Sequence, residues 1–140
     1  MAAIFNETKM AKLLLYLLFL GLLPVAQAPN TQQMKKDFTA AFSKGDTSPL
    51  QNYFKGFVNV NIPGNNGFFS ETKAQWLLQD FFKKNKVSGF SLKEEGFAGV
   101  NYYFIGLYHS HQTRWNIYFL FSPGNNGFQI QQIDIEESDS

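Results

Sequence analysis

The spacing of the apolar residues changes along this chain, and that change limits the folds that the chain can adopt. Over residues 31–57, apolar side chains fall three or four positions apart, as they do on one face of a helix. From Val58 to Ile62 they alternate with asparagines, which is the period of a strand with one buried face. After another helical stretch, the alternation returns. The sequence therefore predicts the α+β class, with helices packed on a curved antiparallel sheet.

Two helices are predicted ahead of the first strand. Asn30 or Thr31 can cap the first helix, and Gly45 ends it. Ser48 is the expected N-cap of a short second helix, with Pro49 at its first helical position. The apolar positions of these two helices are expected to face the core: Met34, Phe38, Ala41, Phe42, Leu50, Tyr53, Phe54 and Phe57.

A longer helix and four strands are predicted to follow. Ser70 can cap this helix, which is expected to run from Glu71 to about Lys86. Its expected core face consists of Ala74, Leu77, Leu78, Phe81 and Phe82. The strands are expected over Phe90–Glu95, Asn101–Ser110, Arg114–Phe121 and Phe128–Glu136.

The last predicted strand changes parity along its length. Phe128 and Ile130 share one parity, whereas Ile133 and Ile135 share the other. A straight strand would turn one of these pairs to the wrong face. A β-bulge near residues 131–132 would restore agreement and bend the sheet; alternatively, the sheet is apolar on both faces.

The hexapeptide Pro-Gly-Asn-Asn-Gly-Phe occurs twice, at residues 63–68 and 123–128. Glycine and asparagine adopt positive φ at low cost, which favours two turns. The alternative is a pair of ligand-binding loops with free backbone N–H groups. The first copy is expected to join a strand to a helix, and the second to join two strands.

The first 28 residues have the features of a secretory signal peptide. Lys9 and Lys12 precede an apolar run, Leu13–Val25, that a small-residue Ala-Gln-Ala sequence closes. The run is about 13 residues long, short of the ~20 that span a bilayer as a helix. Residues 1–28 are therefore predicted to be a signal peptide and 29–140 a single domain, with export to the periplasm or beyond and no membrane span after cleavage. An uncleaved anchor is the alternative.

The composition of the predicted domain excludes several classes of function. Without Lys9, Lys12 and Glu7, ten basic and ten acidic residues remain of the 12 and 11 in the whole chain. Because the charges balance, the domain has no excess of positive charge that would attract nucleic acid or an anionic membrane. The chain has no cysteine, which excludes thiol chemistry and disulfides, so that stability must come from packing. Its 16 phenylalanines suit that task.

The order of the predicted elements is similar to that of the nuclear-transport-factor-2-like fold. Within that fold, the chain resembles a family of short exported bacterial domains of unknown function over nearly all of residues 31–137. The matching segments are Phe42-Ser43-Lys44-Gly45-Asp46, Leu50, Tyr53-Phe54, Ala74, Asp80-Phe81-Phe82, Tyr103-Phe104-Ile105-Gly106 and Ile130-Gln131-Gln132-Ile133-Asp134-Ile135-Glu136. The resemblance implies a cone of helices against a strongly bent sheet and a bacterial envelope location. It assigns no catalytic residue, because the family has none established that matches here. The fold does not choose a function either, since it is found in isomerases, dehydratases, binders and non-catalytic dimer modules.

The two histidines of the chain, His109 and His111, fall near strand ends. With a turn at residues 112–113, His109 would face Asn116, and Tyr118 would lie on the same face. His109 is then a candidate general base. A metal site is not expected, because a third ligand is missing nearby. The opposite face is the expected core: Phe104, Tyr108, Trp115, Ile117, Phe119 and Phe121.

Asp134 is the second candidate general base. It lies between Ile133 and Ile135, so it points away from the core if those two residues are buried. If Asp134 instead faces inward, with Tyr102 or Trp115, it is placed for proton transfer.

The sequence favours an exported, non-catalytic binding or interaction module with no cofactor. A small apolar molecule or a protein would bind in an aromatic-lined pocket, or the sheet would form a homodimer. The candidate ligand-binding residues are Tyr102, Trp115, Asn116 and Tyr118. The alternatives are a small-molecule isomerase or lyase that acts by proton transfer, and an envelope scaffold without a ligand.

Overall fold

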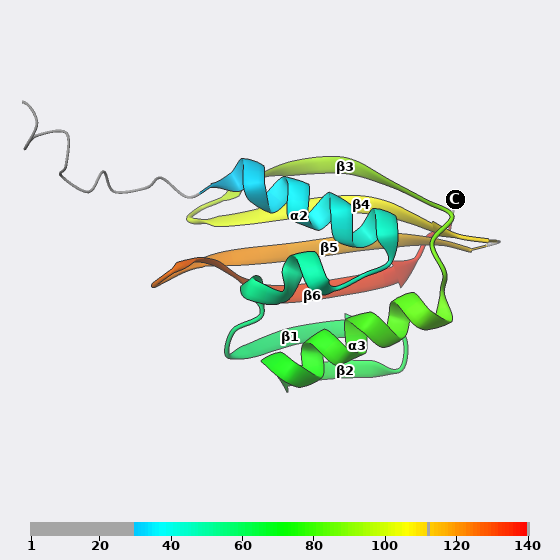
Figure 1. Ribbon diagram of the computed structural model, residues 1–140, viewed down its shortest axis with the longest axis horizontal. Helices are drawn as coiled ribbons and strands as arrows, with labels where there is room; N and C mark the ends of the chain where they lie inside the picture. Colours follow the sequence, from blue (N-terminus) through cyan, green and yellow to red (C-terminus); the bar gives the residue numbers. More distant parts are fainter. Residues whose placement is uncertain (1–29, 112, 140) are drawn as a thin grey trace, which may run out of the picture.

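The computed structural model of the protein describes residues 30–111 and 113–139 (Figure 1). Two helices and one 3-10 helix lie on the same face of a single sheet (Figure 1). The predicted signal peptide, residues 1–28, lies outside the described residues. No helix among the described residues has the length and hydropathy to span a membrane. The elements in chain order are α2 (Thr31–Lys44), η1 (Ser48–Tyr53), β1 (Phe57–Ile62), β2 (Asn65–Ser70), α3 (Glu71–Lys84), β3 (Gly89–Ala98), β4 (Asn101–Ser110), β5 (Thr113–Gly124) and β6 (Gly127–Glu137).

The six strands are arranged in the order β2-β1-β6-β5-β4-β3. Consecutive strands pair antiparallel, whereas β1 and β6 pair parallel. The parallel pair arises because the last strand returns to the middle of the sheet, beside the first. The α+β class and the cone of helices against a sheet are confirmed, with a mixed sheet in place of a purely antiparallel one.

The ends of the two long helices follow from their capping residues. The Asn30 side chain accepts a hydrogen bond from the Gln33 N–H at 3.0 Å, and Gly45 ends α2 with φ 66°. The Ser70 hydroxyl oxygen accepts from the Lys73 N–H at 3.3 Å at the start of α3. α3 ends at Lys84, two residues earlier than predicted. The predicted core faces of both helices are buried.

The second helix differs from its prediction in two respects. It is a 3-10 helix whose N-cap is Thr47, one residue before the expected Ser48. Leu50 and Phe54 are buried as predicted, but Phe57 is 76% exposed. The helix ends before Phe57 can join its apolar face, because that residue already begins β1 with its side chain on the face away from the helices.

β2 is an edge strand that the sequence did not predict. Its residues alternate between partial burial and exposure, and its first half consists of turn-forming asparagines and glycine. The first hexapeptide is therefore a hairpin turn at Pro63-Gly64 followed by strand, and not a strand-to-helix connection. In the second copy the turn falls on Asn125-Asn126. The same six residues thus turn at different positions in two hairpins, because the strand pairing decides the register.

The predicted bulge in the last strand is confirmed. Leu120 of β5 pairs with Gln132, whereas the next residue, Phe121, pairs with Ile130. Gln131 is therefore the extra residue, and the bulge turns two apolar pairs to the helix-covered face. All four are buried: Phe128, Ile130, Ile133 and Ile135.

The β4–β5 hairpin keeps its predicted faces but not its predicted register. His109 pairs with Arg114 in place of Asn116, and Asn116 pairs with Leu107. The reversal comes earlier than expected because Thr113 already belongs to β5. The shift changes each partner by two positions, so every side chain stays on its predicted face.

The core is a network of aromatic rings between α2 and the sheet. The ring of Phe38 lies 4.7–5.6 Å, centroid to centroid, from the rings of Phe42, Phe90, Phe104 and Phe119. All of these rings except that of Phe90 are fully buried.

Gly106 of β4 makes room for the Phe90 ring. A Cβ atom at Gly106 would lie 2.5 Å from Cε2 of Phe90, which is far inside van der Waals contact. The ring of Phe90 stacks on that of Phe42, with centroids 5.3 Å apart, so a displacement of Phe90 would break this contact. A residue without a side chain at this position of the sheet therefore permits the ring cluster.

Deletion of Gln131 tests the role of the bulge. A straight β6 would turn two large apolar side chains to the open face, at roughly 1.5–3 kcal/mol each. We expect the free energy of unfolding, measured by urea denaturation, to fall by about 3–6 kcal/mol. Gln131→Ala keeps the residue count and should change it by less than about 0.5 kcal/mol. A well-folded deletion variant of unchanged stability would contradict this account of the bulge.

Tyr108 makes the stability of the fold sensitive to alkaline pH. Its side chain is fully buried, its hydroxyl donates to the carbonyl oxygen of Asn85, and burial raises its pKa from 10 to about 12. The folded chain keeps this proton longer than the unfolded chain does, so the contribution is complete below pH 10 and is lost as the pH rises through about 12. We expect Tyr108→Phe to cost about 1 kcal/mol at neutral pH and to flatten the alkaline decline in the urea midpoint. If the urea midpoints of the two proteins declined equally steeply with rising pH, this assignment to Tyr108 would be contradicted.

Candidate functional site

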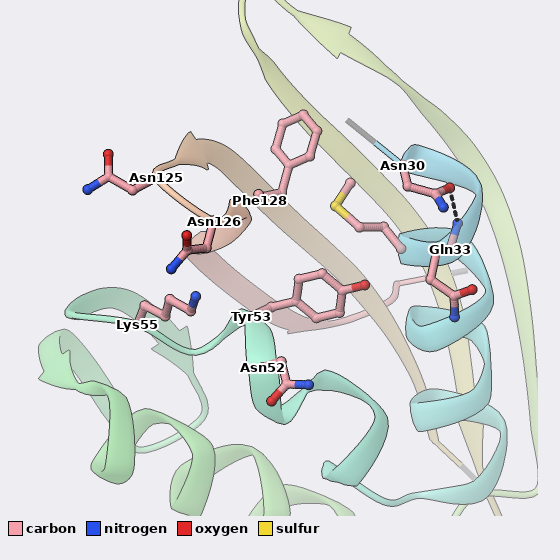
Figure 2. Close-up of a pocket in the computed structure, with 10 residues that line it drawn as sticks. Asn30, Gln33, Asn52, Tyr53, Lys55, Asn125, Asn126 and Phe128 are labelled. Carbon is pink, nitrogen blue, oxygen red and sulfur yellow. Dashed lines mark hydrogen bonds between the residues drawn. The ribbon is translucent and has the colours of Figure 1, made fainter. Parts of the chain in front are cut away.

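An open pocket of about 490 Å³ lies where three separate parts of the fold meet. Figure 2 shows side chains from the first turn of α2, from the end of η1 and the residues after it, and from the β5–β6 hairpin around one opening. The volume falls within the ~300–1,000 Å³ typical of small-molecule sites. The residues that line it are Asn30, Gln33, Met34, Asn52, Tyr53, Lys55, Asn125, Asn126, Gly127 and Phe128.

Local structure places each part of this lining. Asn30 and Gln33 face the pocket because they form the cap and first turn of α2. Asn125 and Asn126 form the turn between β5 and β6 and are exposed. Phe128 is 7% exposed and provides a largely buried apolar wall. The pocket therefore has an amide-rich rim over an apolar base.

Asp37 organises one wall of the pocket from behind. One of its oxygens, Oδ2, accepts the Tyr53 hydroxyl at 2.6 Å, and the other, Oδ1, accepts from Gln33 Nε2 at 2.9 Å. Both donors line the pocket, whereas Asp37 does not. The carboxylate thus fixes the orientation of two pocket side chains on different elements.

Tyr53 stays protonated throughout the neutral range. Burial and the hydrogen bond to Asp37 both raise the pKa of its hydroxyl well above 10. Its ring also packs edge-on against Phe121, with centroids 5.6 Å apart. Tyr53 is therefore a fixed, neutral part of the wall, with its proton committed to Asp37.

Lys55 provides the charge of the pocket lining. No aspartate or glutamate is among the described residues that form this lining. Lys55 is half-buried and makes no ion pair with any other residue that the structure describes. The lining is therefore mostly neutral and polar, with one cation.

Both candidate general bases lie on the face of the sheet that the helices leave open. Asp134 lies between the buried residues Ile133 and Ile135, as predicted, and accepts a hydrogen bond from Gln132 Nε2 at 2.8 Å. His109 is half-buried at the far end of β4, beside the hairpin that leads to β5. Neither side chain is on the same face of the sheet as the pocket.

The four candidate ligand-binding residues are divided between the two faces. Tyr102 and Trp115 face the helices, and the centroid of the Tyr102 ring lies 6.5 Å from that of Phe128, a residue of the pocket lining. Tyr118 and Asn116 lie on the open face, where Tyr118 is paired with Asp134. Burial and the nearby Asp134 carboxylate raise the pKa of Tyr118. The four residues do not converge on one site.

Sequence reasoning missed the pocket because its lining comes from distant segments. The nearest signal was the repeated hexapeptide, whose second copy contributes four consecutive lining residues, 125–128. The first copy contributes none to this lining. Both copies form turns, as the sequence favours, and the second copy also lies in this pocket lining, a difference that periodicity alone could not distinguish.

Glu95 is a further side chain whose position the sequence did not predict. A register shift between Leu92 and Glu94 places Glu95 opposite Phe104, on the helix-covered face. There its Oε1 lies 3.0 Å from Lys35 Nζ, while Oε2 is buried without a hydrogen-bond partner among the described residues. Glu95 is thus an ion-paired carboxylate between α2 and β3, outside the pocket lining.

No group of three His, Cys, Asp or Glu side chains suited to holding a metal ion occurs within residues 30–111 and 113–139.

Comparison with known proteins provides a family and a fold. The family model described as a domain of unknown function, DUF4783, matches residues 35–136. A DUF4783 family protein from Bacteroides ovatus superposes with a TM-score of 0.69 at 27% identity, over 74% of this chain and 94% of that one. Another, from Bacteroides fragilis, gives 0.67 at 29% identity, over 73% and 96%.

More distant structures share the fold alone. A putative dehydratase from the NTF2-like family of Streptomyces avermitilis superposes with a TM-score of 0.56 at 11% identity, over 76% of this chain and 91% of that one. The chain matches no protein of curated function.

Proposed function

The chain belongs to the bacterial DUF4783 family, whose function is unknown and whose fold is nuclear-transport-factor-2-like, and we propose that it is an exported, non-catalytic binding module. Its site is the pocket between α2, η1 and the β5–β6 hairpin (Figure 2). The observation that carries this proposal is the contrast between a polar, open pocket at the edge of the fold and an interior filled by aromatic rings.

The filled interior argues against proton-transfer chemistry inside the cone. Such chemistry needs a carboxylate or histidine whose pKa is tuned by burial next to the substrate. Among the described residues, the buried polar or charged ones are Thr47 and Ser110. Glu95 faces the helices, but its charge is paired with Lys35 at the side of α2. The isomerase or lyase alternative would thus depend on His109 or Asp134, which lie on the open face.

The groups in the pocket itself also suit binding better than catalysis. The amides do not titrate, and Tyr53 stays protonated and donates its hydroxyl proton in a hydrogen bond to Asp37. A site without a group that titrates near neutral pH is poor at general acid–base work. Polar groups around an apolar base instead match the usual architecture of a binding site.

A sheet-mediated homodimer is the second candidate. Phe57 and Phe68 are 76% and 74% exposed, and both lie on the open face of the sheet, on β1 and β2. Tyr103, Ile105 and Leu107 of β4 lie half-buried on the same face. Large apolar side chains exposed on one face favour contact with a partner.

Export is proposed on the order of residues before the domain. Lys9 and Lys12, the apolar run Leu13–Val25 and the small residues after it match a signal peptide. A mature protein that lacks about the first 28 residues is therefore expected.

Native mass spectrometry of the protein purified from its own organism tests these proposals together. We expect a shortened chain that carries an extra mass, and we expect this mass to disappear in a denatured control. The double variant Asn125→Ala/Asn126→Ala should weaken the affinity for this ligand about thirtyfold, and so lower its occupancy, because it removes two pocket amides at about 1 kcal/mol each.

The first copy of the hexapeptide provides the matched control. Asn65→Ala/Asn66→Ala makes the same change outside the pocket lining, so it should leave the occupancy unchanged. Equal loss from both double variants would contradict binding in the pocket. A dimer with no added mass would support the interaction module in its place, and an intact N-terminus would contradict cleavage.

A further inference from the structure

We propose that the pocket binds a neutral polyhydroxyl ligand, a saccharide, and that Asp37 is the positioning residue that sets this preference. This inference rests on the proposed binding function and adds the chemical class of the ligand. It follows from which hydrogen-bonding atoms of the lining are already used within the protein and which are left for a ligand.

Asn30 offers the pocket donors. Its side-chain oxygen accepts the Gln33 N–H at 3.0 Å as part of the helix cap. The amide NH₂ of Asn30 is therefore the part left for a ligand, because an amide has one oxygen and two N–H groups. Lys55 adds a second donor to the lining.

Gln33 and Tyr53 offer the pocket acceptors. Gln33 donates through Nε2 to Asp37, which leaves its Oε1 for a ligand. The Tyr53 hydroxyl donates its one proton to the same carboxylate, which leaves the lone pairs of the Tyr53 oxygen for a ligand. Because Asp37 only accepts, Gln33 Oε1 and the Tyr53 oxygen are left as acceptors toward the pocket, and the second N–H of Gln33 Nε2 remains as a donor.

The remaining amides offer both kinds of atom. Within the described part of the chain, the side chains of Asn52, Asn125 and Asn126 make no hydrogen bond. Each amide presents a coplanar oxygen and nitrogen, which can pair with two neighbouring hydroxyl groups. A hydroxyl both donates and accepts, so a polyhydroxyl ligand can use every one of these positions. The half-buried ring of Tyr53 can pack against the C–H groups of a sugar ring.

An anionic ligand fits this arrangement less well. It would gain from Lys55, but it would meet the acceptor oxygens of Gln33 and Tyr53 with the Asp37 charge behind them. Acceptors without donors cost about 1–3 kcal/mol for each buried group left unpaired. An extended peptide fits less well too, because the backbone of the β5–β6 hairpin already pairs up to Gly124 and Gly127.

A titration followed by nuclear magnetic resonance tests this proposal. The probes are glucose, galactose, mannose and N-acetylglucosamine, with acetate and tetra-alanine as the alternative ligand classes. We expect at least one saccharide to shift the side-chain amide signals of the pocket residues, and acetate and tetra-alanine to leave them in place or bind more weakly.

The variant Asp37→Asn distinguishes the ligand classes by the direction in which the affinity for each of them changes. It removes a charge and one of two acceptor positions, so Gln33 or Tyr53 must reorient. Saccharide affinity should then fall roughly tenfold, the equivalent of one hydrogen bond to a charged group, while any acetate binding should strengthen. If Asp37 had only a structural role, the variant would bind both saccharide and acetate more weakly. Asp80→Asn removes an equal charge on α3, where Asp80 pairs with Lys84, and should change neither.

Tyr53→Phe provides a second variant that keeps the ring and removes the oxygen. It should weaken saccharide binding without loss of the folded spectrum. Tighter binding of acetate or tetra-alanine than of any saccharide at these signals would overturn the ligand class and leave the binding function standing. No shift with any saccharide would also overturn the class. If, in addition, native mass spectrometry found no extra mass on the protein, the proposed binding function would itself be contradicted.

Discussion

The ring of Phe38 is the contact on which the rest of this structure depends. It joins α2 to three strands at once, through Phe90 on β3, Phe104 on β4 and Phe119 on β5. Aromatic pairs at such distances contribute about 0.5–1.5 kcal/mol each beyond the area that they bury. A chain without cysteine has no covalent cross-link to replace these contacts.

The ring cluster also determines where a ligand can bind. Because aromatic side chains occupy the space between α2 and the sheet, the polar groups gather where the packing ends. That place is the pocket beside the first turn of α2, where Asp37 links Gln33 to Tyr53. Adjacent turns of α2 therefore serve the two roles. The first turn lines the pocket, and the next packs against the aromatic rings of the core.

Much of the fold could be predicted from local rules. The caps Asn30, Gly45 and Ser70 were identified by residue type and position, and the bulge at Gln131 was identified by parity alone. Both signals are local, since a cap needs a side-chain acceptor or a positive φ, and a buried face needs one parity.

The remaining features depend on pairing between distant segments. β2 was missed because residues 65–67 consist of turn formers, and only their pairing with β1 makes them strand. The pocket was missed for a related reason: Asn30, Asn52 and Asn126 are unremarkable surface residues until the fold brings them together. The open-face positions of Asp134 and His109 followed from alternation, whereas the partner of His109 depended on where the hairpin reverses.

The free energy of unfolding of Phe38→Ala tests the central claim that a solid ring cluster holds the fold together and leaves binding to its edge. We expect a loss of about 3–5 kcal/mol, as for a large aromatic side chain removed from a packed core. Phe57→Ala removes the same ring from an exposed position and should cost less than about 0.5 kcal/mol. Similar small losses for both variants would mean that the interior is loosely filled, and would contradict the claim.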